Sequence, residues 1–133
     1  MTDFKLTSSM LTMGGTFYPT GYLFIMFPSA DDAHHVANQV AHFADKPEVM
    51  ELNAATVLRE VGQVDGDSDL DLPSVGTEGA TTRKYIQLAR KGHCAVMVKV
   101  DSDEAAERVM QVVRKTPFSY GQRYHLLAME DLE

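Results

Sequence analysis

Apolar positions along the chain form two similar units, each a strand-like apolar run followed by a stripe of helical period. Residues 21–27 (GYLFIMF) precede residues 29–33 (SADDA), and residues 94–100 (CAVMVKV) precede residues 101–105 (DSDEA). In both units apolar residues then recur three and four positions apart, as on one face of an amphipathic helix. The pattern therefore predicts two strand–helix units related by internal pseudo-symmetry.

Each of the two helices begins with a capping signal. Ser29 and Asp101 are each followed, three positions later, by an acidic residue, which is the spacing of a capping box. In the first helix Asp32 takes the place of the longer Glu. Phe43 completes the apolar stripe of this helix, and Val112 belongs to the stripe of the other. We therefore expect helices that start at Ser29 and Asp101 and turn these stripes toward the protein core.

Between the two units the pattern predicts a short strand and two helices. Residues 49–52 have the composition of a strand, and Asn53 is a good N-cap for a short helix that ends at Gly62. A polar loop with four aspartates follows at residues 63–76. Residues 77–90 then return to a helical pattern. The middle of the chain is therefore expected to be a helical insert.

The order of these elements predicts the fold class. Gly92 is expected to end the preceding helix in a left-handed conformation, and residues 122–129 are expected to form the last strand. Residues 1–20 form an N-terminal extension or an extra strand. We expect one α+β domain over residues 1–133, a ferredoxin-like βαβ–insert–βαβ sandwich, with an antiparallel sheet, helices on one face and the insert at residues 53–91.

Both faces of the predicted sheet are apolar. In the first strand Tyr22, Phe24 and Met26 share one face, and the alternate residues, which are also apolar, share the other. At about 25 cal/mol per Å² of apolar area, leaving several such side chains in water would cost several kcal/mol. The second face must be covered by the insert or by a second copy of the chain. We expect a homodimer or higher homo-oligomer formed through the sheet.

Composition and charge limit the partners. The formal net charge of −7 opposes binding to nucleic acid and to an anionic membrane surface. The longest apolar run is too short to cross a bilayer, and the first residues have no basic, signal-like start. A single cysteine allows no internal disulfide. We therefore expect a cytoplasmic protein.

Two groups of residues are candidates for ligand binding. The start of the helix near residue 77 has free backbone N–H groups that favour anions, and the candidates there are Thr77, Gly79, Thr81 and Arg83. This segment does not match a P-loop, and flexible threonine capping is the alternative. A second group would form an apolar pocket for a small apolar or aromatic ligand if its strands are neighbours. That group is Tyr22, Tyr124 and His125.

Catalytic and metal-binding patterns are weak. The acidic run at residues 65–71 has Leu70 where a calcium loop needs Gly, so a solvated loop is the better interpretation. Cys94 follows His93 on a predicted strand, and neighbouring strand residues point to opposite faces, so this histidine is badly placed to activate the thiol. We predict no catalytic residue, no metal site and no cofactor.

The second unit resembles a known domain type. Residues 89–93 (ARKGH) lead into residues 95–100 (AVMVKV) and then into residues 101–107 (DSDEAAE), and residues 27–33 (FPSADDA) repeat the theme. This is similar to the bacterial general stress protein, or heat-induced stress protein, domain. The resemblance implies an α+β fold and a bacterial cytoplasmic protein, and it carries no activity or site residues.

The favoured interpretation is a non-enzymatic, self-associating domain that binds a small ligand. One alternative is a small dimeric α+β barrel enzyme that uses His125 with Tyr22 or Tyr124 in an apolar pocket. The other alternative is an RNA-binding module that stacks bases on aromatic residues of the first strand. The net charge and the lack of a sequence motif for RNA binding argue against this last function.

Overall fold

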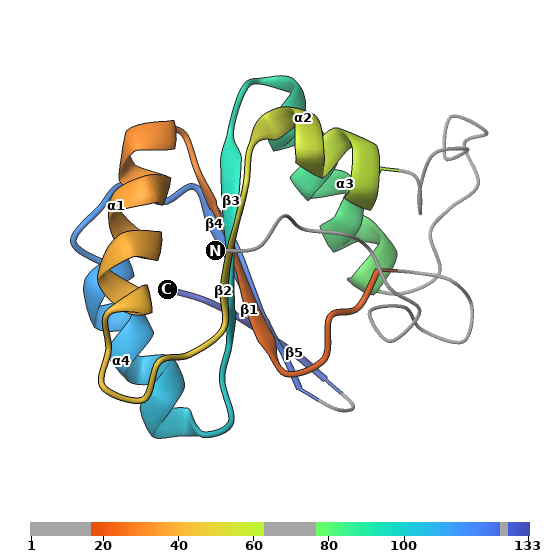
Figure 1. The fold of residues 1–133 in the computed structure, drawn as a ribbon. Helices are drawn as coiled ribbons and strands as arrows, with labels where there is room; N and C mark the ends of the chain where they lie inside the picture. The colour runs from red at the N-terminus through yellow and green to blue at the C-terminus, as the bar shows by residue number, and fades with distance from the viewer. Residues whose placement is uncertain (1–16, 63–76, 126–127) are drawn as a thin grey trace.

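The described residues form a five-stranded sheet with helices on both faces (Figure 1). The computed structural model describes residues 17–62, 77–125 and 128–133. The strands are β1 (Tyr22–Phe27), β2 (Val49–Leu52), β3 (Cys94–Lys99), β4 (Tyr120–Tyr124) and β5 (Met129–Asp131). The helices are α1 (Ala30–Ala41), α2 (Ala54–Thr56), η2 (Val57–Val61), α3 (Thr77–Arg90) and α4 (Asp103–Val113).

The sheet has the strand order β2-β3-β1-β4-β5, and all neighbouring strands are antiparallel. β1 pairs with β3 from Tyr22 opposite Lys99 to Phe27 opposite Cys94. The strands of the two similar units therefore lie side by side at the sheet centre, as the sequence predicts. An α+β fold with an antiparallel sheet is confirmed.

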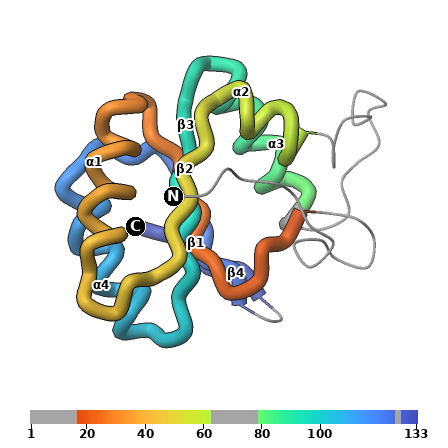
Figure 2. Tube along the Cα trace, in the orientation of Figure 1, coloured from red at the N-terminus to blue at the C-terminus, as the bar shows by residue number. Residues whose placement is uncertain are grey.

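The first face of the sheet is covered by α1 and α4. Figure 2 shows these two helices on one side of the strands and α2 and α3 on the other. Alternate residues of the two central strands pack against the apolar stripes of α1 and α4. The residues of β1 and β3 in this core are Leu23, Ile25, Phe27, Cys94, Val96 and Val98, and β2 adds Val49.

The second face is covered by the insert, with help from the segment before β1. Phe24 and Met97 of the central strands pack against Val57 of η2 and Tyr85 of α3, and Phe17 closes the same core. The expectation of helices on one face only is therefore wrong. Of the two covers that the sequence allowed, the insert occupies this face, so its burial requires no second subunit. Assembly through the sheet remains a prediction.

Capping explains where most of the helices start. Ser29 Oγ accepts a hydrogen bond from the N–H of Asp32, and Asn53 Oδ1 accepts one from the N–H of Thr56, as predicted. The predicted cap of the last helix is wrong by one residue. Ser102, not Asp101, caps α4, with its hydroxyl oxygen 3.1 Å from Ala105 N. Serine reaches this N–H from an extended conformation just outside the helix.

Glycine is required at two positions for different reasons. Gly92 has φ of +93°, so it ends α3 in the predicted left-handed region. The insert helix changes from α2 to the π-helix η2, and its last bond runs from the N–H of Gly62 to the carbonyl of Val57. A Cβ at Gly62 would lie 2.2 Å from the Leu58 carbonyl oxygen. Glycine is therefore needed where this wider turn closes.

The predicted last strand at residues 122–129 is wrong. The chain instead forms two antiparallel strands, β4 and β5, with Gln122 opposite Asp131. The N–H of His125 donates to the carbonyl of Ala128, 2.9 Å away, and closes the hairpin. No Gly, Pro, Asn or Asp marks this turn, because residues 125–128 are HLLA. The apolar run therefore suggested one continuous strand.

Two sequence predictions fall outside the described residues. These are the N-terminal extension or extra strand at residues 1–20, of which residues 1–16 are outside the described ranges, and the acidic loop at residues 63–76. Among the helices in the described ranges, none combines the length and the apolar character that crossing a bilayer requires.

Candidate functional site

A buried cluster of tyrosines joins α3 to β4. The hydroxyl oxygens of Tyr85 and Tyr124 lie 2.7 Å apart, and these side chains are 0% and 1% exposed. Tyr18 packs edge-on against Tyr124, and its own hydroxyl donates to the carbonyl of His125. Burial, followed by the proximity of Tyr124, raises the pKa of Tyr85 well above the ordinary tyrosine value. The Tyr85 hydroxyl is therefore a neutral, structural group at physiological pH.

A second polar network lies beside this cluster. Gln122 Nε2 donates to the Tyr120 hydroxyl at 3.0 Å and to the carboxylate of Asp131. The Tyr120 hydroxyl is 3.5 Å from Thr81 Oγ1, and Lys84 Nζ lies 5.0 Å from the centre of the Tyr120 ring. The network connects α3 to both strands of the final hairpin. Buried polar groups that are satisfied in this way fix the packing of elements.

The predicted anion site at the start of α3 is only partly described. Thr81 is 2% exposed and faces Tyr120 of the sheet, so its hydroxyl is turned inward. Gly79 and Arg83 are half-buried, and Thr77 is the first residue of the helix. The residues that precede the helix lie outside the described ranges. Anion binding here therefore remains a prediction, with Thr81 the least available of its residues.

The predicted pocket residues Tyr22, Tyr124 and His125 come from neighbouring strands, because β1 pairs with β4. Their polar atoms nevertheless have different partners. The Tyr22 hydroxyl donates to Glu48, and desolvation followed by this hydrogen bond raises the pKa of Tyr22 to about 12. Tyr124 pairs with Tyr85, and His125 Nε2 lies 2.9 Å from Glu130 Oε1. The structure thus does not direct these three groups at one ligand.

His125 instead lines a charged groove of about 530 Å³ beside α4 and the final hairpin. Both arginines of this groove are paired. Arg123 Nη1 lies 2.7 Å from Asp103 Oδ1, and Arg114 Nη1 lies 2.6 Å from Glu107 Oε2. The hydrogen bond from Arg114 also holds the pKa of Glu107 below its usual range. The basic groups are therefore engaged by carboxylates of the chain itself.

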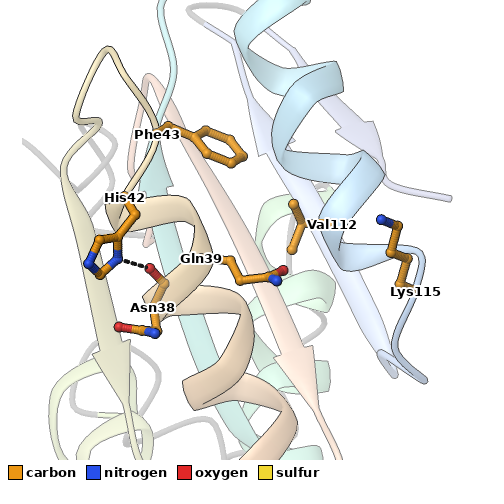
Figure 3. A pocket seen from close by; sticks show the side chains of 6 residues that line it. All are labelled: Asn38, Gln39, His42, Phe43, Val112 and Lys115. Atoms are coloured by element: carbon orange, nitrogen blue, oxygen red, sulfur yellow. Dashed lines mark hydrogen bonds between the residues drawn. The ribbon is translucent and has the colours of Figure 1, made fainter.

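An apolar groove lies between α1 and α4 on the outer side of the helix layer (Figure 3). Its volume is about 490 Å³. Phe43 and Val112 give it an apolar floor, and both side chains are half-buried and pack on the core beneath. Its polar rim is formed by Asn38, Gln39, His42 and Lys115. The arrangement suits an apolar group that is flanked by polar or charged groups of the same ligand.

A second cavity of about 230 Å³ continues this groove past Phe43, which lines both. Val109 of α4 forms part of its floor, and the carboxylates of Asp45, Glu48 and Asp101 lie along it. The two cavities share Phe43, and we refer to them together as the helix-layer groove. It runs from Lys115 at one end to these acidic residues at the other.

Sequence reasoning missed this groove. Phe43 and Val112 lie in the predicted apolar stripes, so both were assigned to the core. They lie at the margins of those stripes, where both side chains stay half-buried. The signal in the sequence is the width of the α4 stripe, because Val109 and Val113 already satisfy the helical repeat and Val112 adds to it.

No protein-family model, no curated protein and no solved structure matches the chain. The resemblance to the general stress protein domain therefore remains a prediction.

Cysteine and histidine side chains are dispersed in the structure. Cys94 is 7% exposed with its sulfur 3.9 Å from the Gly92 carbonyl oxygen, whereas His93 Nδ1 lies 2.9 Å from Ser119 Oγ. Within the described ranges, no three His, Cys, Asp or Glu side chains are grouped as metal ligands would be. The helix-layer groove is therefore the best candidate for a binding site.

Proposed function

We propose that the chain is a non-enzymatic binding domain and that the helix-layer groove is its binding surface. The observation that carries this proposal is the placement of Phe43 and Val112, two partly exposed apolar side chains within a hollow that has a polar rim. Leu58 is the large hydrophobic side chain exposed elsewhere in the described ranges, and no described cavity contains it. Apolar surface within a concave site favours binding of an apolar group.

We also propose that the fold is of the ferredoxin-like type. The order β2-β3-β1-β4 and the placement of α1 and α4 on one face support this proposal. The insert between β2 and β3 and the edge strand β5 are additions to such a core. The described residues of these additions do not line the helix-layer groove, so they leave it available to a ligand.

The alternative functions have less support. An enzyme that uses His125 with Tyr22 or Tyr124 needs these groups in one pocket, and their polar atoms have separate partners. An RNA-binding module needs an exposed aromatic residue on the sheet. Phe24 is 0% exposed, and the rings of Tyr85 and Phe17 lie 4.2 and 5.6 Å from its own. Stacking of a base there would require the insert to leave the sheet.

The ligand would be an apolar or aromatic group of modest size. The site is a shallow depression on the surface and not an enclosed cavity, so a bound group would stay partly exposed. Burying about 100 Å² of apolar surface would contribute roughly 2.5 kcal/mol before the cost of association is subtracted. The groove should therefore bind such groups weakly when they are presented alone.

The test is binding of the dye anilinonaphthalene sulfonate, which fluoresces when its rings enter an apolar site. The protein is used at concentrations where light scattering gives the monomer mass. We expect saturable binding that Val112→Asp reduces at least about tenfold, because the charge would face the apolar floor. Gln111→Asp is the matched control, since Gln111 is an exposed neighbour on the same helix. Equal binding by both variants would overturn the proposal.

A further inference from the structure

We infer that the occupant of the helix-layer groove is a second copy of this chain, related to the first by a two-fold axis that passes near Val112 and Phe43. This inference rests on the proposed function, because it names the partner of the same groove. It differs from assembly through the sheet, since both faces of the sheet are already covered by helices of the chain.

The first support is the charge at the two ends of the groove. Lys115 lies at the end near Gln39, and Asp101 lies beyond Phe43 at the other end. Within the described part of the chain, neither side chain has an ion-pair partner, whereas Asp45 is held by Arg108 at 3.0 Å. Lys99 also lines the second cavity, but Glu48 and Asp101 outnumber it there. The end at Lys115 is therefore positive and the other end is net negative.

The second support is the symmetry of this arrangement. In a two-fold dimer the same surface patch meets itself. An axis that lies in the interface perpendicular to the groove places each end of the groove against the opposite end of the partner. The apolar centre of one copy would lie on the apolar centre of the other. Lys115 would approach Asp101 of the second copy, and this pair would occur twice. A patch with an apolar centre and opposite charges at its ends is complementary to itself.

The third support is the direction of the helices. Asp45, just after α1, is bound by Arg108 at the middle of α4. Phe43 and Ala105 line the same cavity, so the C-terminal end of α1 lies beside the N-terminal half of α4. The pair is therefore antiparallel, as Figure 2 also shows. Two antiparallel pairs can stack face to face about a two-fold axis with their grooves aligned, which places the ends as described above.

The experiment is sedimentation equilibrium with two charge reversals. The wild-type chain should show a mass that rises with concentration from 14.7 kDa toward twice that value. Lys115→Glu and Asp101→Lys should each weaken self-association about tenfold, because both symmetric contacts change from attraction to repulsion. Lys91→Glu is the control for Lys115→Glu, since it lowers the net charge by the same two units from an exposed position just after α3. Asp101→Lys makes the chain less negative, so weaker association of this variant cannot come from overall repulsion.

Mixing the two single variants gives the sharpest result. The Lys115→Glu chain and the Asp101→Lys chain should form a heterodimer more readily than either forms a homodimer, because both end contacts then join opposite charges. The double variant Lys115→Glu/Asp101→Lys should also self-associate as the wild type does. Dimers of wild-type strength from each single variant alone, or no association of the mixture, would overturn the inference.

The two proposals fail in different ways. A wild-type chain that stays at 14.7 kDa at every concentration, yet binds the dye in a manner that depends on Val112, overturns the dimer and leaves the binding surface standing. Both proposals are overturned if Val112→Asp leaves dye binding unchanged and the charge reversals at Lys115 and Asp101 leave dimerisation unchanged. Far-ultraviolet circular dichroism of every variant verifies that each one folds.

Discussion

Replacing Tyr85 with phenylalanine should remove a pH-dependent part of the stability. The Tyr85 hydroxyl is buried and lies 2.7 Å from that of Tyr124. At neutral pH, Tyr85→Phe removes one hydrogen bond and should cost about 1–2 kcal/mol. In the wild type the folded-state pKa of Tyr85 is raised above the unfolded value of about 10.

The sign of the pH effect follows from proton binding. Above pH 10 the unfolded chain loses the Tyr85 proton, whereas the folded chain keeps it because burial penalises the phenolate. The contribution of this group is therefore fully present below about pH 10 and is lost as the pH rises further. The loss amounts to about 1.4 kcal/mol at pH 11. The advantage of wild type over Tyr85→Phe should thus shrink nearly to zero at pH 11.

The assay is urea unfolding followed by circular dichroism at pH 8, 10 and 11, because the chain has no tryptophan. Val57→Ala serves as the matched control. This residue is buried in the same core but carries no phenol, so the difference between wild type and this variant should stay constant over the same range. A wild-type advantage over Tyr85→Phe that is unchanged from pH 8 to 11 would refute the reasoning.

Three further predictions concern single residues. Gly62→Ala should lower the free energy of unfolding by about 1–3 kcal/mol, since its Cβ would overlap the Leu58 carbonyl oxygen; thermal melting that matches wild type would contradict this. Ser102→Ala should lower the free energy of unfolding by about 1 kcal/mol, and Asp101→Ala should lower it by less than about 0.5 kcal/mol. A larger loss for Asp101→Ala in urea unfolding would favour the cap predicted from sequence. Gln122→Ala should lower the free energy of unfolding by about 2 kcal/mol in the same assay, because the side chain is 2% exposed and its amide group donates hydrogen bonds to both strands of the final hairpin. An unchanged free energy of unfolding would show that those hydrogen bonds are dispensable.

Local signals predicted the two strand–helix units well. Ser29 caps α1 and Gly92 ends α3 in the structure as the sequence indicates, because each signal depends on a few neighbouring residues. The apolar character of both faces of β1 showed that both must be covered. It could not show which part of the structure covers the second face, since Phe24 would be buried equally well by the insert or by another chain.

The rest of the fold and the site depend on contacts distant in sequence. The turn between β4 and β5 has no glycine or proline to mark it, so the hairpin was taken for one strand. Tyr85 and Tyr124 are 39 residues apart, and only the packing of α3 on β4 brings their hydroxyls together. Phe43 and Val112 likewise form a groove only because α1 and α4 lie side by side.

The central claim is that the chain binds a second copy of itself through the helix-layer groove, and a dilution series of amide nuclear magnetic resonance spectra tests it most directly. As the wild-type protein is concentrated, amide signals of residues 38–45, 101 and 109–115 should shift together along one binding curve. Signals of β1 should stay in place because this strand lies within the sheet. Signals of α3 should stay in place because this helix covers the face of the sheet opposite the groove. Shifts confined to α3 and the central strands, or concentration-dependent mass without any shift in the groove, would contradict the account.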